Sequence, residues 1–220
     1  TGLNSYGGEW RTRGEIGRIT GLRSEYFQPL GGRGQFYVSP YIEYRAFDQP
    51  VRVDDTVQSV YRVSRGATGF DVGYEFGGHS RVYAGLLRGH GSARVEVGGA
   101  EFQDLSENIG ALRLGYVRDT LDDANFPGSG SRGEFLLASQ INVIGASDNG
   151  EIADFTWDKA LSRGPNRILF GTRLHASWGN PGVFDGLVPL GGFTNLSGFA
   201  ERELLGENAA LFRAVYYRRL

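Results

Sequence analysis

The amino-acid sequence predicts an all-β protein in which about ten long strands run antiparallel. The 220 residues include 35 Gly, 11 Tyr, 14 Phe and 3 Trp, so turn formers and aromatic residues are abundant while helix signals are weak. Side chains of opposite character alternate along ten separate stretches, as they do in strands that have two different faces. Short and long connections alternate between these stretches, which is typical of an up-and-down antiparallel β-barrel.

Hydropathy excludes a membrane-spanning helix but permits a membrane-spanning barrel. Hydrophobic residues make up 40% of the chain, the mean hydropathy is −0.30, and no run of about eighteen apolar residues occurs. A transmembrane barrel carries its apolar band in every second residue, so its average hydropathy stays near that of a soluble protein. The absence of Cys removes disulfide frameworks and thiolate metal sites. A formal net charge of −2 without a basic cluster argues against nucleic acid as a partner.

Ten stretches carry the alternation and are the expected strands. They cover residues 8–19, 22–29, 36–48, 57–77, 80–98, 108–118, 131–144, 151–161, 167–178 and the stretch from Ala209 onward. The first has an uncharged face that includes Trp10 and a charged face that includes Glu9, and we expect a break at Thr20 before the second strand. The third shows the clearest alternation. Pro40 lies inside it, and because proline has no N–H group we expect a bulge or a locally missing ladder bond there.

Two apparent changes of phase interrupt the next two strands. Residues 49–56 are expected to form a loop before the fourth strand. Within that strand the apolar residues change parity between Val63 and Phe70, which predicts a β-bulge near Gly66. In the fifth strand the apolar residues change parity again across residues 89–91, which predicts a second slip.

The later strands are regular. In residues 108–118 Leu112 and Leu114 alternate with arginine, in residues 151–161 Phe155 and Trp157 share one face, and residues 167–178 repeat the pattern. Turns at residues 146–150 and 162–166 separate them. From Ala209 the chain alternates again, with arginine on one side only.

Residues 188–206 form the one long irregular segment, rich in Gly and polar residues. Loops of this length without secondary structure are either functional or disordered, and the spaced apolar residues Phe193, Leu196 and Phe199 argue against disorder. We therefore expect an ordered, functional loop. Its polar residues are unsuited to lipid and its large apolar ones to water, so we expect it to fold into the polar interior of the barrel.

The motifs of this loop resemble a known superfamily. Leu190-Gly191-Gly192-Phe193, then Asn195-Leu196-Ser197-Gly198-Phe199, then Leu205-Gly206 and a final strand, resemble the loop and following strand of the BamA and two-partner-secretion superfamily of outer-membrane barrels (bacterial surface antigen domain). The Asn-Leu-Ser-Gly-aromatic form most resembles the C-terminal translocator barrel of patatin-like phospholipase autotransporters, which belong to type V secretion. The general pattern has arginine where this chain has Ser197.

A second motif supports the resemblance independently of the loop. The run from Arg118 to Gly130 is similar to a periplasmic turn of the superfamily, in which an Asp-rich run precedes Phe-Pro and Gly. The residues that carry it are Arg118, Asp119, Asp122, Phe126, Pro127 and Gly130. This assignment places the turns at Gly31, Gly77 and Gly164 on the periplasmic side, and residues 188–206 on the external side.

The resemblance implies an antiparallel transmembrane β-barrel, of sixteen strands in the family, in a Gram-negative outer membrane. The chain would then be a single barrel domain, residues 1–220, incomplete at one or both ends. Its implied function is translocation or anchoring for protein secretion or assembly. Implied partners are outer-membrane lipids, a passenger or secreted polypeptide and the barrel assembly machinery, with a homodimer as a further candidate. The side chains expected to face the lumen are Arg113, Arg173, His175 and Arg213, and the three arginines are candidates to pair with Glu201 or Glu203 of the loop.

Two other interpretations of the sequence stay open: a passive porin-like channel and a soluble β-sandwich binding domain. In the barrel reading Trp10, Tyr44, Tyr74, Trp157, Trp178 and Tyr216 suit interfacial aromatic girdles, whereas in a sandwich they would be core. The upstream sequence would distinguish the readings, because a patatin domain or polypeptide-binding repeats would identify the family.

No enzymatic chemistry is expected of this segment. The residues His79, His90 and His175 are far apart in sequence and have no metal-ligand spacing, and we expect no metal or other cofactor. The Asp residues near position 122 lack calcium-loop spacing and are interpreted as a solvated turn. No Gly-x-Ser-x-Gly motif occurs, and no Ser is expected to share a strand face with a His, so no catalytic residue is assigned. The resemblance implies that phospholipase chemistry would lie upstream.

Overall fold

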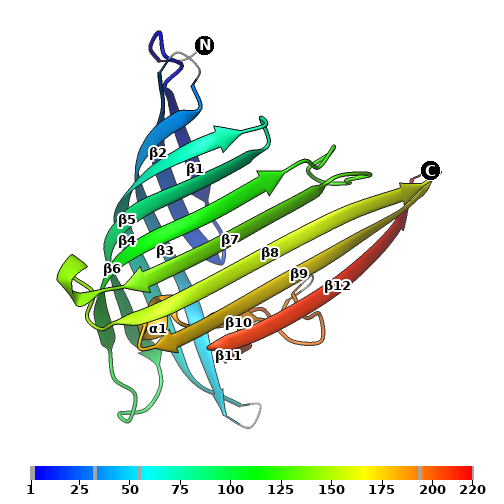
Figure 1. The fold of residues 1–220 in the computed structure, drawn as a ribbon. Coiled ribbons are helices and arrows are strands. Elements are labelled where there is room, and N and C mark those ends of the chain that lie inside the picture. The colour runs from blue at the N-terminus through cyan, green and yellow to red at the C-terminus, as the bar shows by residue number, and fades with distance from the viewer. Residues whose placement is uncertain (1–2, 32–33, 54–55, 193–194, 220) are drawn as a thin grey trace.

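The computed structural model describes residues 3–31, 34–53, 56–192 and 195–219, and most of them form one antiparallel sheet. Its ten strands are β1 (Glu9–Glu15), β2 (Ile19–Leu30), β3 (Phe36–Val53), β4 (Thr56–Phe76), β5 (Ser80–Val97), β6 (Leu105–Asp119), β7 (Ser131–Gln140), β8 (Gly150–Arg163), β9 (Asn166–Gly179) and β12 (Asn208–Arg218), in that spatial order (Figure 1). A second sheet pairs β10 (Val188–Leu190) with β11 (Leu204–Gly206). The 3-10 turn η1 (Asn142–Ile144) and the one-turn helix α1 (Gly182–Asp185) complete the fold.

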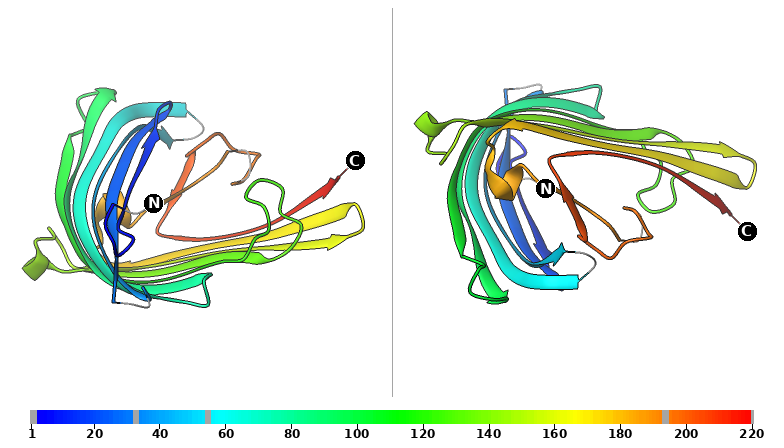
Figure 2. Two further views of the ribbon diagram at one scale, coloured as in Figure 1. Left: turned by 90° about the horizontal axis from the view of Figure 1, so that it is seen from above. Right: turned by 90° about the horizontal axis from the view of Figure 1, so that it is seen from below.

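The large sheet curves strongly about the segment that joins β9 to β12. Figure 2 shows the ten strands following an arc, with α1, β10 and β11 on its concave side. The strands β1 and β12 lie at opposite edges, and no pairing joins them among the described residues. The prediction of an all-β fold built from antiparallel strands is therefore confirmed. None of the helices in the described ranges is long and apolar enough to cross a membrane.

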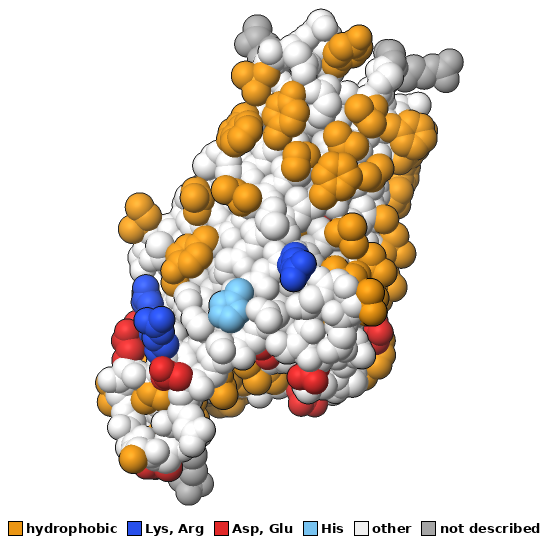
Figure 3. Space-filling model, turned by 90° about the vertical axis from the view of Figure 1, so that its left-hand side faces the viewer, with side chains coloured by type: hydrophobic (Ala, Val, Ile, Leu, Met, Phe, Trp, Pro, Cys, Tyr) orange, Lys and Arg blue, Asp and Glu red, His pale blue; other side chains and the backbone are white. Residues whose placement is uncertain are grey.

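The convex face of the sheet is apolar because register aligns the apolar residues of neighbouring strands. Val72 of β4 pairs with Ala84 of β5, Ala84 with Leu114 of β6, and Leu114 with Leu137 of β7. Many large side chains are exposed on this face, among them Phe36, Ile42, Phe70, Leu86, Leu112, Phe170, Trp178 and Phe212. Figure 3 shows this surface, with hydrophobic side chains covering its upper part and charged side chains confined to its lower part. We call this apolar zone the outer belt.

Aromatic rings follow one edge of the outer belt. Phe36 of β3 contacts Tyr74 of β4 edge-on at 4.9 Å between ring centroids, Tyr74 stacks on Phe76 at 6.2 Å, and Phe76 on Tyr116 of β6 at 6.3 Å. This edge lies at the end of the sheet that carries the turns near Gly31, Gly77 and Gly164 and the turn between β6 and β7 (Figure 1). All four turns lie at the same end, as the alternation of short and long connections predicts.

The concave face is polar and closely packed. Three tyrosines of this face lie across glycines of the next strand: Tyr37 over Gly73, Tyr41 over Gly69, and Tyr83 over Gly115. A Cβ atom at each of these glycines would stand within 2.2–2.4 Å of the ring at Gly69 and Gly73, and 2.1 Å at Gly115. The absent side chains therefore make room for aromatic rings on the inner wall.

The predicted β-bulge near Gly66 and the predicted slip across residues 89–91 are both wrong. The register of β4 with β3 and with β5 runs unbroken from Tyr61 to Tyr74, and β5 pairs with β6 without a shift from Ser80 to Ala93. Val63 faces the concave side and Phe70 faces the convex side. One strand with a continuous register therefore carries apolar residues on both faces. The character of the convex face changes along β5 at Arg88 because the strand leaves the outer belt there, not because its parity changes.

Several expected boundaries also change. The first turn lies at residues 16–18, where Gly17 adopts a φ of 156°, and Thr20 belongs to β2 instead of forming a break. The predicted loop at residues 49–56 is mostly strand, since β3 continues to Val53 with a register shift between Val51 and Arg52. The strand expected over residues 131–144 ends at Gln140.

Proline inside β3 has the local effect expected of it. Val38 pairs with Gln28 of β2 and Tyr41 with Glu25, whereas the two positions between them, which include Pro40, make no ladder pair with β2. The register does not shift, so the locally missing ladder bond is the form the irregularity takes.

Candidate functional site

The segment that joins β9 to β12, residues 180–207, contacts the concave wall along its length, and we call it the inner segment. Its helix α1 places Phe184 against a buried cluster formed by Tyr41 of β3, Leu87 of β5 and Ile109 of β6. The carboxylate of Glu107 accepts hydrogen bonds from the backbone N–H of Phe184 at 3.0 Å and of Val183 at 3.3 Å. The packing of Phe184 and the two hydrogen bonds to Glu107 at the start of the helix thus hold α1 on the wall.

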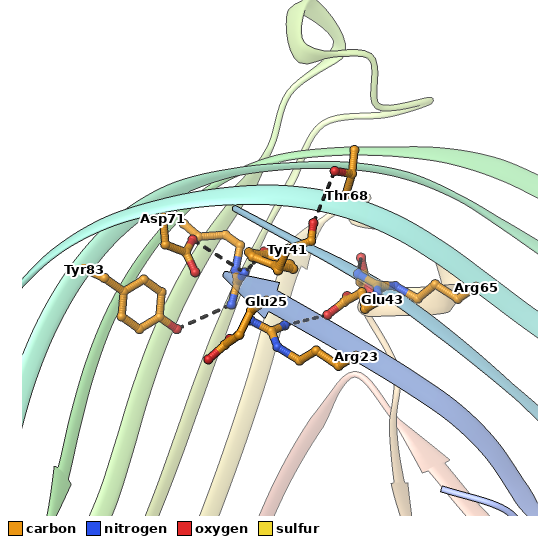
Figure 4. Close-up of polar contacts among 10 residues, drawn as sticks. Arg23, Glu25, Tyr41, Glu43, Arg65, Thr68, Asp71 and Tyr83 are labelled. Carbon is orange, nitrogen blue, oxygen red and sulfur yellow. Dashed lines mark hydrogen bonds and ion pairs between the residues drawn. The ribbon is translucent and has the colours of Figure 1, made fainter. Parts of the chain in front are cut away.

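A charged network on the inner wall continues from α1. Arg65 of β4 forms ion pairs with Asp185 of α1, at 2.9 Å, and with Glu43 of β3. Glu43 also pairs with Arg23 of β2 at 2.7 Å. The side chains of Arg65, Glu43 and Asp185 are only 20%, 22% and 21% exposed. Figure 4 shows Arg23, Glu43 and Arg65 of this row, and the pair of Arg65 with Asp185 links the three wall strands to the inner segment.

The network extends to Arg113, one of the residues predicted to face the lumen. Arg113 of β6 donates hydrogen bonds to the hydroxyl groups of Tyr41 and of Tyr83, the latter at 3.4 Å, and lies 3.9 Å from the carboxylate of Asp71 (Figure 4). The guanidinium of Arg23 stacks over the Tyr41 ring at 4.0 Å. Tyr41 therefore joins the two arginines through its hydroxyl group and its ring face.

A second attachment lies where β9 passes α1. His175 of β9 has Nδ1 at 2.7 Å from Asp154 of β8, and its Nε2 lies 3.4 Å from the carbonyl oxygen of Gly186. The hydroxyl of Ser177 donates to the same carbonyl at 2.9 Å, and Gln140 donates to the carbonyl of Pro181 at 2.7 Å. Wall side chains thus satisfy the backbone acceptors of the inner segment.

The expectation that no Ser shares a strand face with a His is wrong, because His175 and Ser177 both face inward from β9. Their separation of two residues along one strand is enough to place them on the same face, and the third member of the set, Asp154, comes from β8. The two side chains are joined through the Gly186 carbonyl, and the Ser177 hydroxyl donates to that carbonyl and not to the imidazole. The set therefore holds the inner segment and does not form an activated nucleophile.

A third attachment holds the far part of the inner segment. Arg202, whose φ is 61°, stacks over the ring of Phe47 at 3.7 Å and donates to the side chain of Gln49 at 3.0 Å. Gln49 in return donates to the Arg202 carbonyl at 3.1 Å. Burial, and then the nearby Arg45, lower the pKa of Arg202 to about 10, so the guanidinium stays protonated at neutral pH.

The predicted loop motif folds as a compact turn in this segment. Gly191, with a φ of 117°, donates to the carbonyl of Asn195 at 2.8 Å, and Gly192 to that of Phe199 at 3.0 Å. A Cβ atom on Gly191 would lie 2.0 Å from the carbonyl oxygen of Ala200, so this position requires glycine. Phe193 lies outside the described residues. Leu196 adopts a φ of 93° and is half-buried, while Ser197, Gly198 and Phe199 are exposed.

The predicted lumen residues all lie on the concave face, but their partners differ from those expected. Arg173 donates to the side chain of Asn195 at 3.3 Å, and Arg213 pairs with Asp158 at 2.8 Å. Glu201 pairs instead with Arg18 at 3.3 Å, and Glu203 with Arg52 at 3.9 Å. Arg113 and Arg213 take their carboxylate partners from other wall strands, whereas the acceptor of Arg173 is the Asn195 side chain of the inner segment itself. Within the described part of the chain, the Ser197 hydroxyl makes no hydrogen bond.

Two cavities border the inner segment. One of about 650 Å³ lies between β2, β3 and β4 and the inner segment, and its lining includes Glu43, Arg65 and Arg202. The other, of about 420 Å³, lies on the inner faces of β7, β8, β9 and β12 and includes Asn195 and Leu211. The inner segment thus divides the space on the concave side.

The turn that carries the second motif is held by its own carboxylates. Asp122 accepts hydrogen bonds from the N–H groups of Gly128 at 2.8 Å and Ser129 at 3.0 Å, and these bonds lower the pKa of the Asp122 carboxyl. Gly130, with a φ of 94°, passes so close to Thr120 that a Cβ atom would stand 1.9 Å from its carbonyl oxygen. The carboxylates are engaged as turn acceptors, and the part of the chain that the structure describes contains no cluster suited to a metal ion.

The same turn reaches the end of β12. Tyr217 of β12 donates its hydroxyl proton to the carbonyl of Pro127, and its ring lies 6.1 Å from that of Phe126. Arg118 is exposed at the end of β6, and Asp119 pairs with Arg132 at 3.7 Å. The Phe-Pro pair of the motif therefore joins the turn between β6 and β7 to the last strand.

Comparison with known proteins shows the fold. No family model matches the sequence, and no curated protein matches it. Among solved structures, the chain is similar to BamA from Haemophilus ducreyi lacking POTRA domains 1–3, with a TM-score of 0.69 and 17% identity. The match covers 89% of this chain and 41% of the BamA chain, so this chain spans about two fifths of the length of its structural relative. At this level of identity, the likeness establishes that the sheet has a BamA-like fold.

Proposed function

We propose that the chain is part of a barrel in a Gram-negative outer membrane that translocates or anchors polypeptides during protein secretion or assembly. The observation that carries the proposal is the division of the sheet into an apolar convex face and a charged concave face on which the inner segment lies. Large apolar side chains exposed over many strands would be an aggregation hazard in water, whereas lipid matches them. The BamA-like fold supports the same assignment.

The finer identity proposed is the translocator barrel of a patatin-like phospholipase autotransporter. It is supported by the Asn195–Phe199 motif and by the turn between Arg118 and Gly130. In this proposal the barrel closes with further strands, of which the family has sixteen, its passenger polypeptide is carried across the membrane, and the barrel assembly machinery inserts it. Self-association as a homodimer belongs to the same proposal.

The contacts of the inner segment favour translocation over a passive pore. A passive porin-like channel needs a permanently open lumen, while here three separate sets of wall side chains hold residues 180–207 in the interior. A soluble β-sandwich would pack an apolar face against a second sheet, yet the concave face carries the charged network instead. The inner segment is proposed to act as a plug that occupies the path of the polypeptide.

The proposed path of the polypeptide can be tested with a photoreactive phenylalanine analogue on β12. Leu211 faces inward and borders the smaller cavity, while Phe212 faces outward and is 72% exposed. We expect irradiation of cells to attach a polypeptide to the analogue at position 211 and only lipid at position 212. The attached polypeptide should be one whose surface display or membrane assembly is lost when the barrel protein is depleted. The absence of polypeptide adducts at position 211, together with free uptake of small solutes, would favour the porin-like alternative.

We also propose that this chain has no hydrolytic activity of its own. The Ser177 hydroxyl is buried and donates to a backbone carbonyl, so Ser177 is not activated as a nucleophile. The purified 220-residue chain, folded in detergent, is expected to release no fatty acid from phospholipid vesicles. Robust lipid hydrolysis that is abolished by Ser177→Ala or by Ser92→Ala would contradict this prediction.

A further inference from the structure

The convex face carries an unpaired cation at one edge of the outer belt. Arg88 of β5 follows Leu86 on this face, and its cross-strand neighbours are Thr68 of β4 and Gly110 of β6. His90 follows two residues later, and both Arg88 and His90 are exposed. Figure 3 shows histidine and Lys or Arg side chains spaced across the middle of this face, below most of its hydrophobic side chains.

The cations of this region differ in their partners. Arg62 of β4 forms an ion pair with Asp48 at 2.8 Å, and Arg94 lies opposite Arg62, two residues from Glu96. Among the described residues Arg88 forms no ion pair, and it lies beside Gly145 of the turn after η1. The Nδ1 atom of His90 contacts the side chain of Asn108 at 3.0 Å. Arg88 is therefore a basic group of this surface for which the described part of the chain supplies no ion-pair partner.

The distance from Arg88 to the opposite edge of the outer belt is close to the thickness of the apolar part of a bilayer. Arg118, on the convex face of β6, marks the opposite edge of the outer belt, and Arg88 pairs with Gly110 of the same strand. The eight residues between positions 110 and 118 rise about 26 Å along the strand, or about 20 Å along the barrel axis at the usual tilt. Since an apolar band is about 25 Å tall, the long Arg88 side chain can reach the headgroups while its stem stays in the belt.

Beyond Arg88 the convex face is polar but mostly uncharged. The hydroxyl groups of Ser64 of β4 and Ser92 of β5 are hydrogen-bonded to each other at 2.9 Å, and Ser106 of β6 pairs with Ser92. Asn108 completes this row beside His90. Serine and asparagine side chains can both donate and accept hydrogen bonds, so they suit hydroxyl groups better than a second phosphate.

We propose that Arg88 and His90 form a binding site for the phosphate of a phosphorylated glycolipid in the outer leaflet. The acyl chains lie against Phe70, Leu86 and Leu112 of the outer belt, the phosphate meets the Arg88 guanidinium, and the sugar hydroxyls meet the serine and asparagine row. A guanidinium that meets a phosphate forms charge-assisted hydrogen bonds, which are about twice as strong as neutral ones. The assignment rests on the proposed membrane location, because only a bilayer would hold the ligand at this height.

The test compares lipid binding by three arginine variants of the full-length protein purified from membranes in a non-ionic detergent. Bisphosphorylated lipid A and its dephosphorylated form are titrated separately, and bound lipid is counted by native mass spectrometry. We expect Arg88→Gln to weaken binding of the phosphorylated form about tenfold, the loss of one charge-assisted contact. Arg62→Gln is the matched control, since Arg62 is also exposed on the convex face but is paired with Asp48, and it should bind within about twofold of the unsubstituted protein. Arg88→Lys should retain part of the affinity.

Three outcomes would overturn the site. These are equal binding by Arg88→Gln and the unsubstituted protein, equal binding of the dephosphorylated lipid, and full displacement by an equimolar phospholipid, which would assign the site to phospholipid instead. Unheated protein that keeps its folded mobility on a gel shows that Arg88→Gln has not unfolded. Failure of the proposed function is seen separately, because the unsubstituted protein would then be absent from the membrane fraction.

Discussion

Replacement of Leu114 by arginine is expected to lower the free energy of unfolding by about 2–4 kcal/mol when the protein is folded in a lipid bilayer. Leu114 lies halfway along the outer belt of β6, between Ala84 and Leu137 of the neighbouring strands, and is 54% exposed in the isolated chain. A side chain this exposed to water would tolerate arginine within about 0.5 kcal/mol, since it loses no buried contact. The large expected cost therefore comes from contact with lipid.

The measurement is denaturant unfolding of the protein in phospholipid vesicles, followed by tryptophan fluorescence. The matched control is Ser92→Arg, on the same face but beyond the outer belt, where arginine should cost about 0–1 kcal/mol. Equally small costs at positions 92 and 114 would mean that the convex face meets water, and recovery of folded protein from buffer without detergent would lead to the same conclusion.

Alternation of side-chain character was enough to predict the ten strands and their antiparallel order. The strands at residues 57–77 and 167–178 match β4 and β9 within a residue or two, because apolar residues recur at every second position near the end of β4 and along most of β9. Strands that are consecutive in the sequence tend to pair with each other. The spatial order of the strands in the large sheet therefore followed from their order along the chain.

Where the prediction failed, the alternation did not show where along each strand the outer belt ends. Apolar residues were assigned to a single face, so inward Val63 beside outward Phe70 suggested a slip. The structure shows that apolar residues occur inside as well, where Phe184 of the inner segment packs on Tyr41, Leu87 and Ile109. Likewise Arg88 and His90 interrupt the apolar pattern of β5 without any change of register.

The candidate site was only partly predictable. Arg113, Arg173 and Arg213 could be placed on the concave face from parity alone. Their partners could not, because a contact such as Arg65 with Asp185 joins residues that are 120 positions apart. The alternation of residues predicts which face of the sheet a side chain occupies. It does not predict which part of the largely irregular inner segment that side chain will contact.

The residues that hold the inner segment on the wall lie outside the Gly-rich loop motif. Residues 179–187 carry little pattern, yet α1 lies there and supplies both Phe184 and Asp185. Ser197, where the resembled family has arginine, makes no hydrogen bond among the described residues. Arg202, five residues further on, holds the wall through Phe47 and Gln49 instead. A charged residue among polar neighbours gives no sequence pattern that would single it out.

Substitution of Arg65 by methionine is expected to loosen the inner segment at α1 and to lower the free energy of unfolding by about 3 kcal/mol, the lower end for loss of one partner of a buried ion pair. Arg65 is 20% exposed and is the residue that pairs with Asp185 of α1. Glu43 keeps Arg23 as a partner at 2.7 Å, whereas among the described residues Asp185 keeps only the Gln140 amide at 3.3 Å. The uncompensated Asp185 carboxylate should then favour the solvated state of α1 over the docked one.

Release can be measured with a Cys at Ser197, probed from outside intact cells with a bulky thiol reagent and compared with a Cys at Asp148 in the exposed turn before β8. In the closed barrel that we propose, the wall shields position 197, so in the otherwise unchanged protein labelling there should be much slower than at position 148, and Arg65→Met should raise it. The control Arg45→Met removes an arginine whose partner Glu15 is 3.9 Å away, with both side chains more than half exposed, so it should cost less than about 1 kcal/mol and leave labelling slow. If position 197 labels as fast as position 148 before any substitution, the segment extends into solvent. The Arg65–Asp185 pair would then not hold a plug.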